Sequence, residues 1–382
     1  MNWYALKDIP PNYFFTKTVF LDDDFVVAAP EMPITPELIQ TLSEWGFREV
    51  SSEGEPRSNY SDGIEQEEAG DTSIIDLSRV SALADTEKIR GAEDFCHELK
   101  VYVDELFSQV FLGDQVSFKG VAERVRDSLD RIKEDQRYLL RVLKNVENAQ
   151  EDYLISHTVK SMIIAIIIGF YIKLPPHRLI ELGVAALFHE IGMLKLPAKV
   201  YLSPNALSPA EQKVIYSHPI LGYNTLKGYD FPLAVSIAAL EHHERENGSG
   251  YPRRLTSDKI SLYSKIIAVA CSYEAISSYR PHREARDGYI GMLELLKNEG
   301  KQYDDTIIRA LVYSLSIYPI GLYVLLSSGK KGQVVDVNPE NPRFPIVQIF
   351  GELNPDGKNK TQETAQDGLR IVRPLTREEI GT

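Results

Sequence analysis

The segment from His189 to Pro252 contains three short histidine-bearing stretches, FHEIGM at 188–193, HP at 218–219 and HHERENGSGYP at 242–252. Histidine is scarce elsewhere, since the 382 residues include only 8. Four of the eight lie in this segment, and His157 precedes it. Imidazole nitrogens beside carboxylate oxygens are typical ligands of divalent transition metals. The segment therefore predicts a metal site.

The composition is that of an ordinary globular protein with an acidic surface. The chain is 43% hydrophobic and 25% charged, and its formal net charge is -13. A surface of this kind repels polyanions, and no run of lysine or arginine offers a binding stripe. We therefore do not expect DNA or RNA as partners, although a locally positive pocket can still bind a small phosphorylated ligand.

Two features predict a cytoplasmic protein. The N-terminus lacks the pattern of a signal peptide, and Cys96 and Cys271 are too few for a disulfide framework. The most apolar run, 162–172, is shorter than the roughly 20 residues that span a bilayer, and Lys160 and Lys173 bracket it. We expect a buried helix there and no membrane association.

Periodicity predicts a mainly α fold. Apolar residues recur every three or four positions over most of the chain between residues 95 and 317, as in amphipathic and buried helices. Short β-like runs follow Pro319, and strand-like runs also flank a predicted helix near the N-terminus. The predicted segments are a small N-terminal α+β domain (1–50), an acidic flexible linker (51–75), connecting helices (76–134), a helical domain (135–320), a short C-terminal β appendage (321–352) and a polar tail (353–382).

The ordered histidine stretches resemble the motifs of the HD-GYP family. The resemblance rests on HEIG at 189–192, HP at 218–219 and the stretch from HHE to GYP at 242–252, and it extends over most of 135–320. This family belongs to the HD superfamily of metal-dependent phosphohydrolases and typically hydrolyses cyclic di-GMP. The resemblance implies an all-helical HD-domain bundle and a bacterial signalling phosphodiesterase.

The resemblance also implies a centre with two divalent ions. Iron or manganese is the expected metal, zinc is an alternative, and a single bound ion is a further option. The implied ligands are His157, His189 and Glu190 for one ion, and Glu190, His218, His242 and His243 for the other. His189 and Glu190 would take part in catalysis. Arg280, Tyr251 and Gly250 would bind the substrate.

Four positions depart from the family pattern. Glu190 replaces an aspartate and keeps the carboxylate, whereas Met193 replaces a lysine and removes a charged contact to phosphate. Cys271 replaces a later aspartate ligand, so it is either a small buried residue or a thiolate ligand that favours zinc or iron. Tyr153 replaces a glutamate that supports a third ion in some members, so we do not expect a three-metal centre.

These departures keep more than one function open. The first hypothesis is hydrolysis of cyclic di-GMP. The alternative, motivated by Met193 and Cys271, is an inactive member that acts as a cyclic di-GMP sensor or a protein-interaction module. A phosphohydrolase for another nucleotide is disfavoured by the Gly-Tyr-Pro loop at 250–252. By resemblance, this loop would contact a diguanylate cyclase domain, and a homodimer is one option for the assembly.

Overall fold

The computed structural model describes residues 2–17, 19–20, 26–28, 33–44, 48–58, 83–143, 153–203, 207–278, 288–298, 300–338, 341–354, 359–365, 368–375 and 377–380. The chain divides into two compact units. One unit contains Leu83–Leu295 and Lys301–Leu315, and the other contains Met1–Ala82, Leu296–Gly300 and Ser316–Thr382. Helices form the first unit and small antiparallel sheets dominate the second, so the predicted mainly α fold with β structure near both ends is confirmed.

The helical unit carries all five histidines of the predicted metal site. Its elements are α2 (Leu83–Leu112), α3 (Phe118–Glu134), α4 (Gln136–Val142), α5 (Tyr153–Tyr171), α6 (Pro176–Phe188), η3 (Ile191–Lys195), α7 (Ala198–Tyr201), α8 (Pro209–Ile215), α9 (His218–Gly228), α10 (Leu233–Glu241), η4 (Ser257–Lys259), α11 (Leu262–Ser277) and α13 (Asp305–Leu315), together with most of α12 (Gly288–Lys297).

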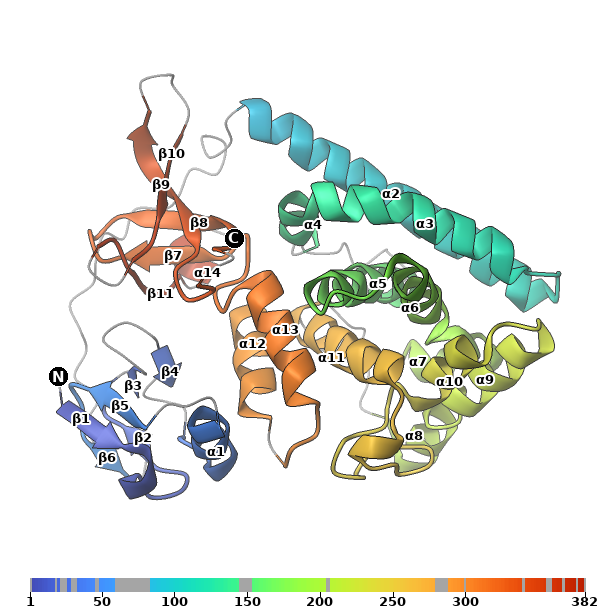
Figure 1. Ribbon diagram of the computed structural model, residues 1–382, viewed down its shortest axis with the longest axis horizontal. Coiled ribbons are helices and arrows are strands. Elements are labelled where there is room, and N and C mark those ends of the chain that lie inside the picture. The colour runs from blue at the N-terminus through green and yellow to red at the C-terminus, as the bar shows by residue number, and fades with distance from the viewer. Residues whose placement is uncertain are drawn as a thin grey trace. The chain divides into compact units, whose positions relative to one another are not determined.

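The helix α5 is the core of this unit. It packs against α2, α3, α6, α11 and α13, and lies in the interior of the helical unit in Figure 1. Its 19 residues are long and apolar enough to cross a membrane by composition, but 83% of its most apolar stretch is buried inside the protein. Helices of soluble cores share this composition, and α5 buries the polar His157 and Lys160 as well. All of the run 162–172 except its last residue thus belongs to a longer buried helix, as expected for a core segment.

The helices α2 and α3 lie side by side and cover one side of the bundle (Figure 1). They run antiparallel, because Arg131 near the end of α3 donates to the carbonyl of Gly91 near the start of α2, 2.8 Å away. Nearer the start of α3 and the end of α2, the guanidinium of Arg124 lies over the ring of Tyr102. Both helices also contact α5, so the segment predicted as connecting helices forms part of the bundle.

The N-terminal part is a small α+β arrangement, as predicted. Its elements are β1 (Asn2–Ala5), η1 (Leu6–Asp8), β2 (Phe14–Phe15), β3 (Val19–Phe20), β4 (Val26–Ala28), α1 (Pro36–Glu44), β5 (Glu49–Ser52) and β6 (Pro56–Arg57). The strands form a sheet of order β1-β5-β3-β4 and a separate pair, β2-β6. The predicted linker begins too early, because residues 51–52 and 56–57 lie in strands. Its part from 59 to 75 lies outside the described residues.

The C-terminal part is a five-stranded antiparallel sheet of order β10-β9-β8-β7-β11. Its strands are β7 (Tyr323–Leu326), β8 (Lys331–Asp336), β9 (Ile346–Leu353), β10 (Asn359–Glu363) and β11 (Ile371–Pro374), and a short helix, α14 (Arg377–Ile380), follows. The prediction of a polar tail from residue 353 is wrong for β10 and β11. These strands form the two edges of the sheet, where exposed polar side chains are tolerated, so their composition does not resemble that of a core strand.

Candidate metal centre

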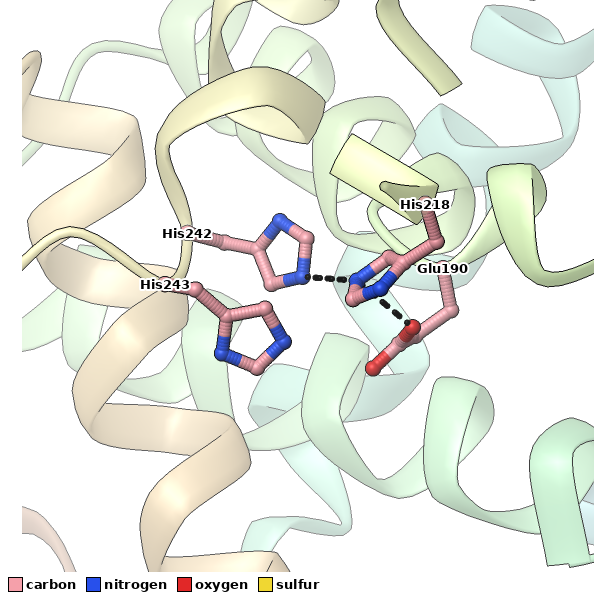
Figure 2. A group of neighbouring side chains, drawn as sticks. All are labelled: Glu190, His218, His242 and His243. Carbon is pink, nitrogen blue, oxygen red and sulfur yellow. Dashed lines mark hydrogen bonds and ion pairs between the residues drawn. The ribbon is translucent and has the colours of Figure 1, made fainter. Parts of the chain in front are cut away.

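The six predicted imidazole and carboxylate ligands converge in the helical unit as two groups that share Glu190. The first group is His157, His189 and Glu190, and the second group is Glu190, His218, His242 and His243. Within each group, one nitrogen or oxygen atom of every residue lies within 4.8 Å of the others. Figure 2 shows the second group, with the imidazoles of His218, His242 and His243 turned towards one another beside Glu190.

The ends of helices position three of the histidines. His189 and His242 directly follow α6 and α10, and His218 comes just after α8. Each Nδ1 atom lies 2.6–2.9 Å from the carbonyl oxygen three residues earlier, at Ala186, Ala239 and Ile215. Carbonyls in the last turn of a helix lack a partner within the helix, and these imidazoles satisfy them. Because a carbonyl only accepts, Nδ1 carries the proton and Nε2 keeps its lone pair.

These lone pairs face one another across short distances. The Nε2 atoms of His218 and His242 lie 3.1 Å apart, and those of His157 and His189 lie 3.3 Å apart. Two unprotonated nitrogens at such a separation repel each other unless a proton or a cation lies between them. A divalent cation bound by both nitrogens removes this conflict in each group.

Glu190 joins the two groups through its two oxygen atoms. Oε1 lies 3.7 Å from Nε2 of His157, in the first group, and Oε2 lies 3.3 Å from Nε2 of His218, in the second. Oε2 is buried and accepts no hydrogen bond from the residues that the structure describes. Burial by itself would raise the pKa of Glu190, but the surrounding imidazoles, His218 foremost, hold this pKa well below its usual range. The residue is therefore an ionised carboxylate able to bridge two ions.

Burial keeps the imidazoles of His189 and His242 neutral and ready to bind metal. Desolvation lowers the pKa of His189 to about 4, and it lowers the pKa of His242 well below its usual value. A neutral imidazole is the form that ligates metals. Five imidazoles with one shared carboxylate thus fit one or two divalent transition ions, and iron, manganese and zinc all accept these donors.

Gly192 allows the turn after Glu190 to reach the start of α9. A Cβ atom at this position would lie 2.0 Å from the carbonyl oxygen of His218 and 2.6 Å from the amide nitrogen of Gly222. Neither backbone atom can move far, so only glycine fits between the two segments. This close approach brings Glu190 and His218 together.

The loop that contains Gly-Tyr-Pro packs directly on the second group. Gly250 is held against the backbone, because an added Cβ would lie 2.4 Å from the carbonyl oxygen of His243. The ring of Tyr251 stacks on that of His243, with centroids 4.6 Å apart, and on the ring of Tyr216 at 4.2 Å. Glu244 holds the loop segment that follows Gly-Tyr-Pro. Its two carboxylate oxygens accept from the amides of residues 253 and 255 at 2.6 and 2.8 Å.

A cavity of about 280 Å³ opens onto both groups. Its lining includes His157, Glu190, His218 and His243 from the two groups. Three tyrosines, Tyr153, Tyr201 and Tyr251, and the apolar Met193 also line it. Arg245 is the only lysine or arginine among the described lining residues. The cavity therefore combines ligand atoms for cations, aromatic rings and one positive side chain.

Comparison with known proteins identifies the helical domain. Residues 141–307 match the family model described as HD domain. The chain therefore contains an HD domain. It is 27% identical over 233 residues to cyclic di-GMP phosphodiesterase PdeB from Borreliella burgdorferi. This match covers 60% of this chain and 62% of that protein. It is 28% identical over 265 residues to cyclic di-GMP phosphodiesterase PA4108 from Pseudomonas aeruginosa. This match covers 69% of this chain and 63% of that protein.

The chain thus spans less than two thirds of the length of either relative. Among solved structures, Bd1817, described as a HDG"Y"P protein from Bdellovibrio bacteriovorus, aligns with a TM-score of 0.51 at 13% sequence identity. The alignment covers 81% of this chain and 97% of that one. At this identity the likeness concerns the fold alone.

Cys271 is the one predicted ligand that lies apart from the two groups. It lines the cavity but belongs to neither group. Its thiol donates to the carbonyl of Ile267, 2.6 Å away and one turn earlier on α11. A cysteine side chain is short, and this bond holds the sulfur beside its own helix. Of the two interpretations of Cys271, the structure favours a small buried residue over a thiolate ligand.

The predicted substrate-binding residues have different outcomes. Tyr251 lines the cavity, and its contact with a substrate stays a prediction. Gly250 is buried against the backbone and is not among the lining residues, so its contribution is to the packing of the loop. Arg280 lies outside the described residues.

Two residues of the HD domain site were missed from the sequence. Arg245 lines the cavity and follows the His-His-Glu stretch directly, so its position beside the motif was the available signal. Glu274 is buried and contacts Nδ1 of His157. It is the single acidic residue in the apolar helix α11, and a lone buried carboxylate of this kind usually has a partner.

Proposed function

We propose that this protein is a metal-dependent phosphodiesterase of the HD-GYP type that hydrolyses cyclic di-GMP in the bacterial cytoplasm. The observation that carries the proposal is the pair of ligand groups joined by Glu190 at a cavity that also presents Arg245 and three tyrosines. The HD domain and its cyclic di-GMP phosphodiesterase relatives support the same reaction class.

The donor set supports a centre with two ions. Divalent ions bound there would activate the attacking water and stabilise both the attacking and the leaving oxygen of an in-line displacement at phosphorus. The first group offers two imidazoles and the second offers three, while Glu190 directs one oxygen to each. We propose iron or manganese, as in the expectation from the family, with zinc as the alternative.

The rest of the cavity supports a substrate that is both anionic and aromatic. Arg245 is fixed by its bonds to the carbonyls of His242 and Glu244, at 3.3 and 2.9 Å, and lies over the ring of Tyr303. In this position the guanidinium charge would contact a phosphate of the substrate. Met193 is apolar and cannot make such a contact. Tyr153 and Tyr201 offer rings on which a purine base would stack.

A second function has a specific observation in its favour. Met193 lines the cavity, and Cys271 provides no carboxylate to the first group. Weaker binding of the first ion would leave a protein that binds cyclic di-GMP without turnover and acts as a sensor or an interaction module. In either case we propose that the loop at 250–252, which packs on the second group, is where a diguanylate cyclase domain would dock.

Turnover of cyclic di-GMP by the purified full chain tests the proposal. Protein loaded with Mn(II) or Fe(II) under anaerobic conditions should convert cyclic di-GMP to pGpG or GMP, detected by chromatography. The matched control is Glu190→Gln, which keeps the size of the side chain and removes its charge, and it should abolish turnover. Activity that appears only after the combined changes Glu190→Asp, Met193→Lys and Cys271→Asp would instead support the binding-only function.

A further inference from the structure

The Nδ1 atom of His157 contacts a different kind of group from the Nδ1 atoms of His189, His218 and His242. His189, His218 and His242 donate from Nδ1 to carbonyls at the ends of their neighbouring helices. His157 lies inside α5, where the backbone carbonyls are used by the helix itself. Its Nδ1 atom instead contacts a carboxylate oxygen of Glu274, which comes from α11.

This contact is built into the core of the helical unit. Glu274 is 2% exposed and His157 is 4% exposed, so water contributes little to the solvation of either group. The two residues are 117 positions apart in the chain, and the packing of α5 against α11 brings them together. Holding an acid at this depth costs free energy unless the acid is paired, and His157 is its partner.

A carboxylate affects a ligating imidazole more than a carbonyl does. Either acceptor fixes the ring and leaves Nε2 free, but an ionised carboxylate also makes Nε2 more basic and brings a negative charge close to the bound cation. Nε2 of His157 faces Nε2 of His189, 3.3 Å away, in the first group. The charge of Glu274 is therefore transmitted towards the position where an ion would lie between them.

The first group has particular need of this charge. Its only own carboxylate is Glu190, which it shares with the second group. Cys271 lies one turn before Glu274 on α11 and directs its sulfur to a backbone carbonyl. Among the described residues, Glu274 is thus the one acidic side chain that contacts the first group without belonging to the second.

We propose that Glu274 is a positioning residue for the metal centre, which acts through His157 to orient the imidazole and to strengthen the binding of the ion in the first group. This inference rests on the proposed metal-dependent function but concerns metal binding alone. It predicts that the two ions differ in their dependence on Glu274. The ion of the first group binds more tightly because of Glu274, and the affinity for the ion of the second group does not depend on it.

The test is metal titration of metal-free protein without nucleotide. Glu274→Gln keeps an acceptor for Nδ1 and removes the charge. We expect calorimetry with Mn(II) to show one binding step weakened about 10–100-fold, with the other step unchanged. The matched control is Glu181→Gln, because Glu181 also accepts a bond from α11, from the hydroxyl of Tyr263 at 2.8 Å, but lies outside both groups. This control should retain both affinities.

A double-mutant cycle separates this role from a purely structural one. Glu274→Gln should cost no further metal affinity once His157→Ala has removed the imidazole, because the carboxylate acts through that ring. If Glu274→Gln does not fold, Glu274→Asp replaces it. The aspartate keeps the charge but is one methylene too short to reach His157, and the same single step should weaken.

Two results would overturn the inference. One is unchanged affinity at both steps in Glu274→Gln or Glu274→Asp, and the other is an equal loss at both steps. A wild-type protein that binds both ions but does not hydrolyse cyclic di-GMP would refute the proposed function and leave this inference intact. Conversely, an active protein with unchanged metal binding after Glu274→Gln would refute the inference alone.

Discussion

The Nε2 atoms of His218 and His242 lie 3.1 Å apart although the Nδ1 atom of each ring already donates to a backbone carbonyl. Both Nε2 atoms therefore present lone pairs to each other, an arrangement that a shared cation stabilises. Because Glu190 directs one oxygen to this group and the other to His157, the centre has the donor geometry for two ions joined by a carboxylate.

Removal of one imidazole should lower the metal content in a way that depends on its group. We expect His242→Ala to lose the ion of the second group and His157→Ala to lose that of the first, so each variant binds about one equivalent less than the wild type. Elemental analysis after dialysis measures this. The control is His177→Ala, because His177 is exposed and belongs to neither group. Full metal content in His242→Ala would contradict the assignment.

Arg245 should contribute to substrate binding rather than to metal binding. A charge-assisted bond to phosphate is worth about 1.5–3 kcal/mol, so Arg245→Gln should weaken the binding of cyclic di-GMP roughly 10- to 150-fold. Calorimetry with the nucleotide measures the change, and elemental analysis should show unchanged metal content. Lys195→Gln serves as the control, since Lys195 is exposed and outside the cavity lining. Equal effects of the two substitutions would argue against a phosphate contact by Arg245.

Gly192→Ala should destabilise the HD domain. The new Cβ would lie 2.0 Å from the carbonyl oxygen of His218, and relief of this clash requires backbone movement. We expect the free energy of unfolding to fall by at least about 1–3 kcal/mol, measured by urea denaturation of metal-free protein. Gly228→Ala is the matched control, because Gly228 ends α9 and an added Cβ there meets no atom within 4 Å. An equally small effect at both glycines would show that the close approach is not required.

Glu244 should hold the Gly-Tyr-Pro loop in place. A glutamine at this position can accept only one of the two amide bonds that Glu244 accepts from residues 253 and 255. A hydrogen bond to a charged group contributes about 1.5–3 kcal/mol, and these two bonds are part-buried. We expect Glu244→Gln to increase hydrogen exchange at 250–256 while metal content stays at the wild-type level. Unchanged exchange in this segment would show that the loop is held by other contacts.

Much of the metal centre could be predicted from the sequence because its ligands occur in short, ordered motifs. Adjacent residues such as His189 and Glu190 carry their chemistry in the local sequence. Glu274 could not be found in this way, because it becomes important only when α11 packs against α5 and brings it to a histidine 117 residues away. Cys271 was ambiguous for a similar reason, since the direction of its thiol depends on the hydrogen bond to Ile267.

The fold shows the same distinction. Apolar periodicity predicted the helical unit, since a buried helix needs a continuous apolar surface. The edge strands β10 and β11 were missed because strands at a sheet edge are stabilised by backbone pairing and carry polar residues such as Asn359 and Lys360. Composition therefore identifies the core of this protein better than its margins.

The most direct test of a shared two-ion centre is electron paramagnetic resonance of the full chain titrated with Mn(II), with the bound metal counted in parallel. Two ions bridged by Glu190 should be magnetically coupled, so the spectrum at full occupancy should differ from that of an isolated ion, and Glu190→Gln should remove the coupling. A spectrum of isolated Mn(II) at every metal ratio, with only one equivalent bound, would contradict the account.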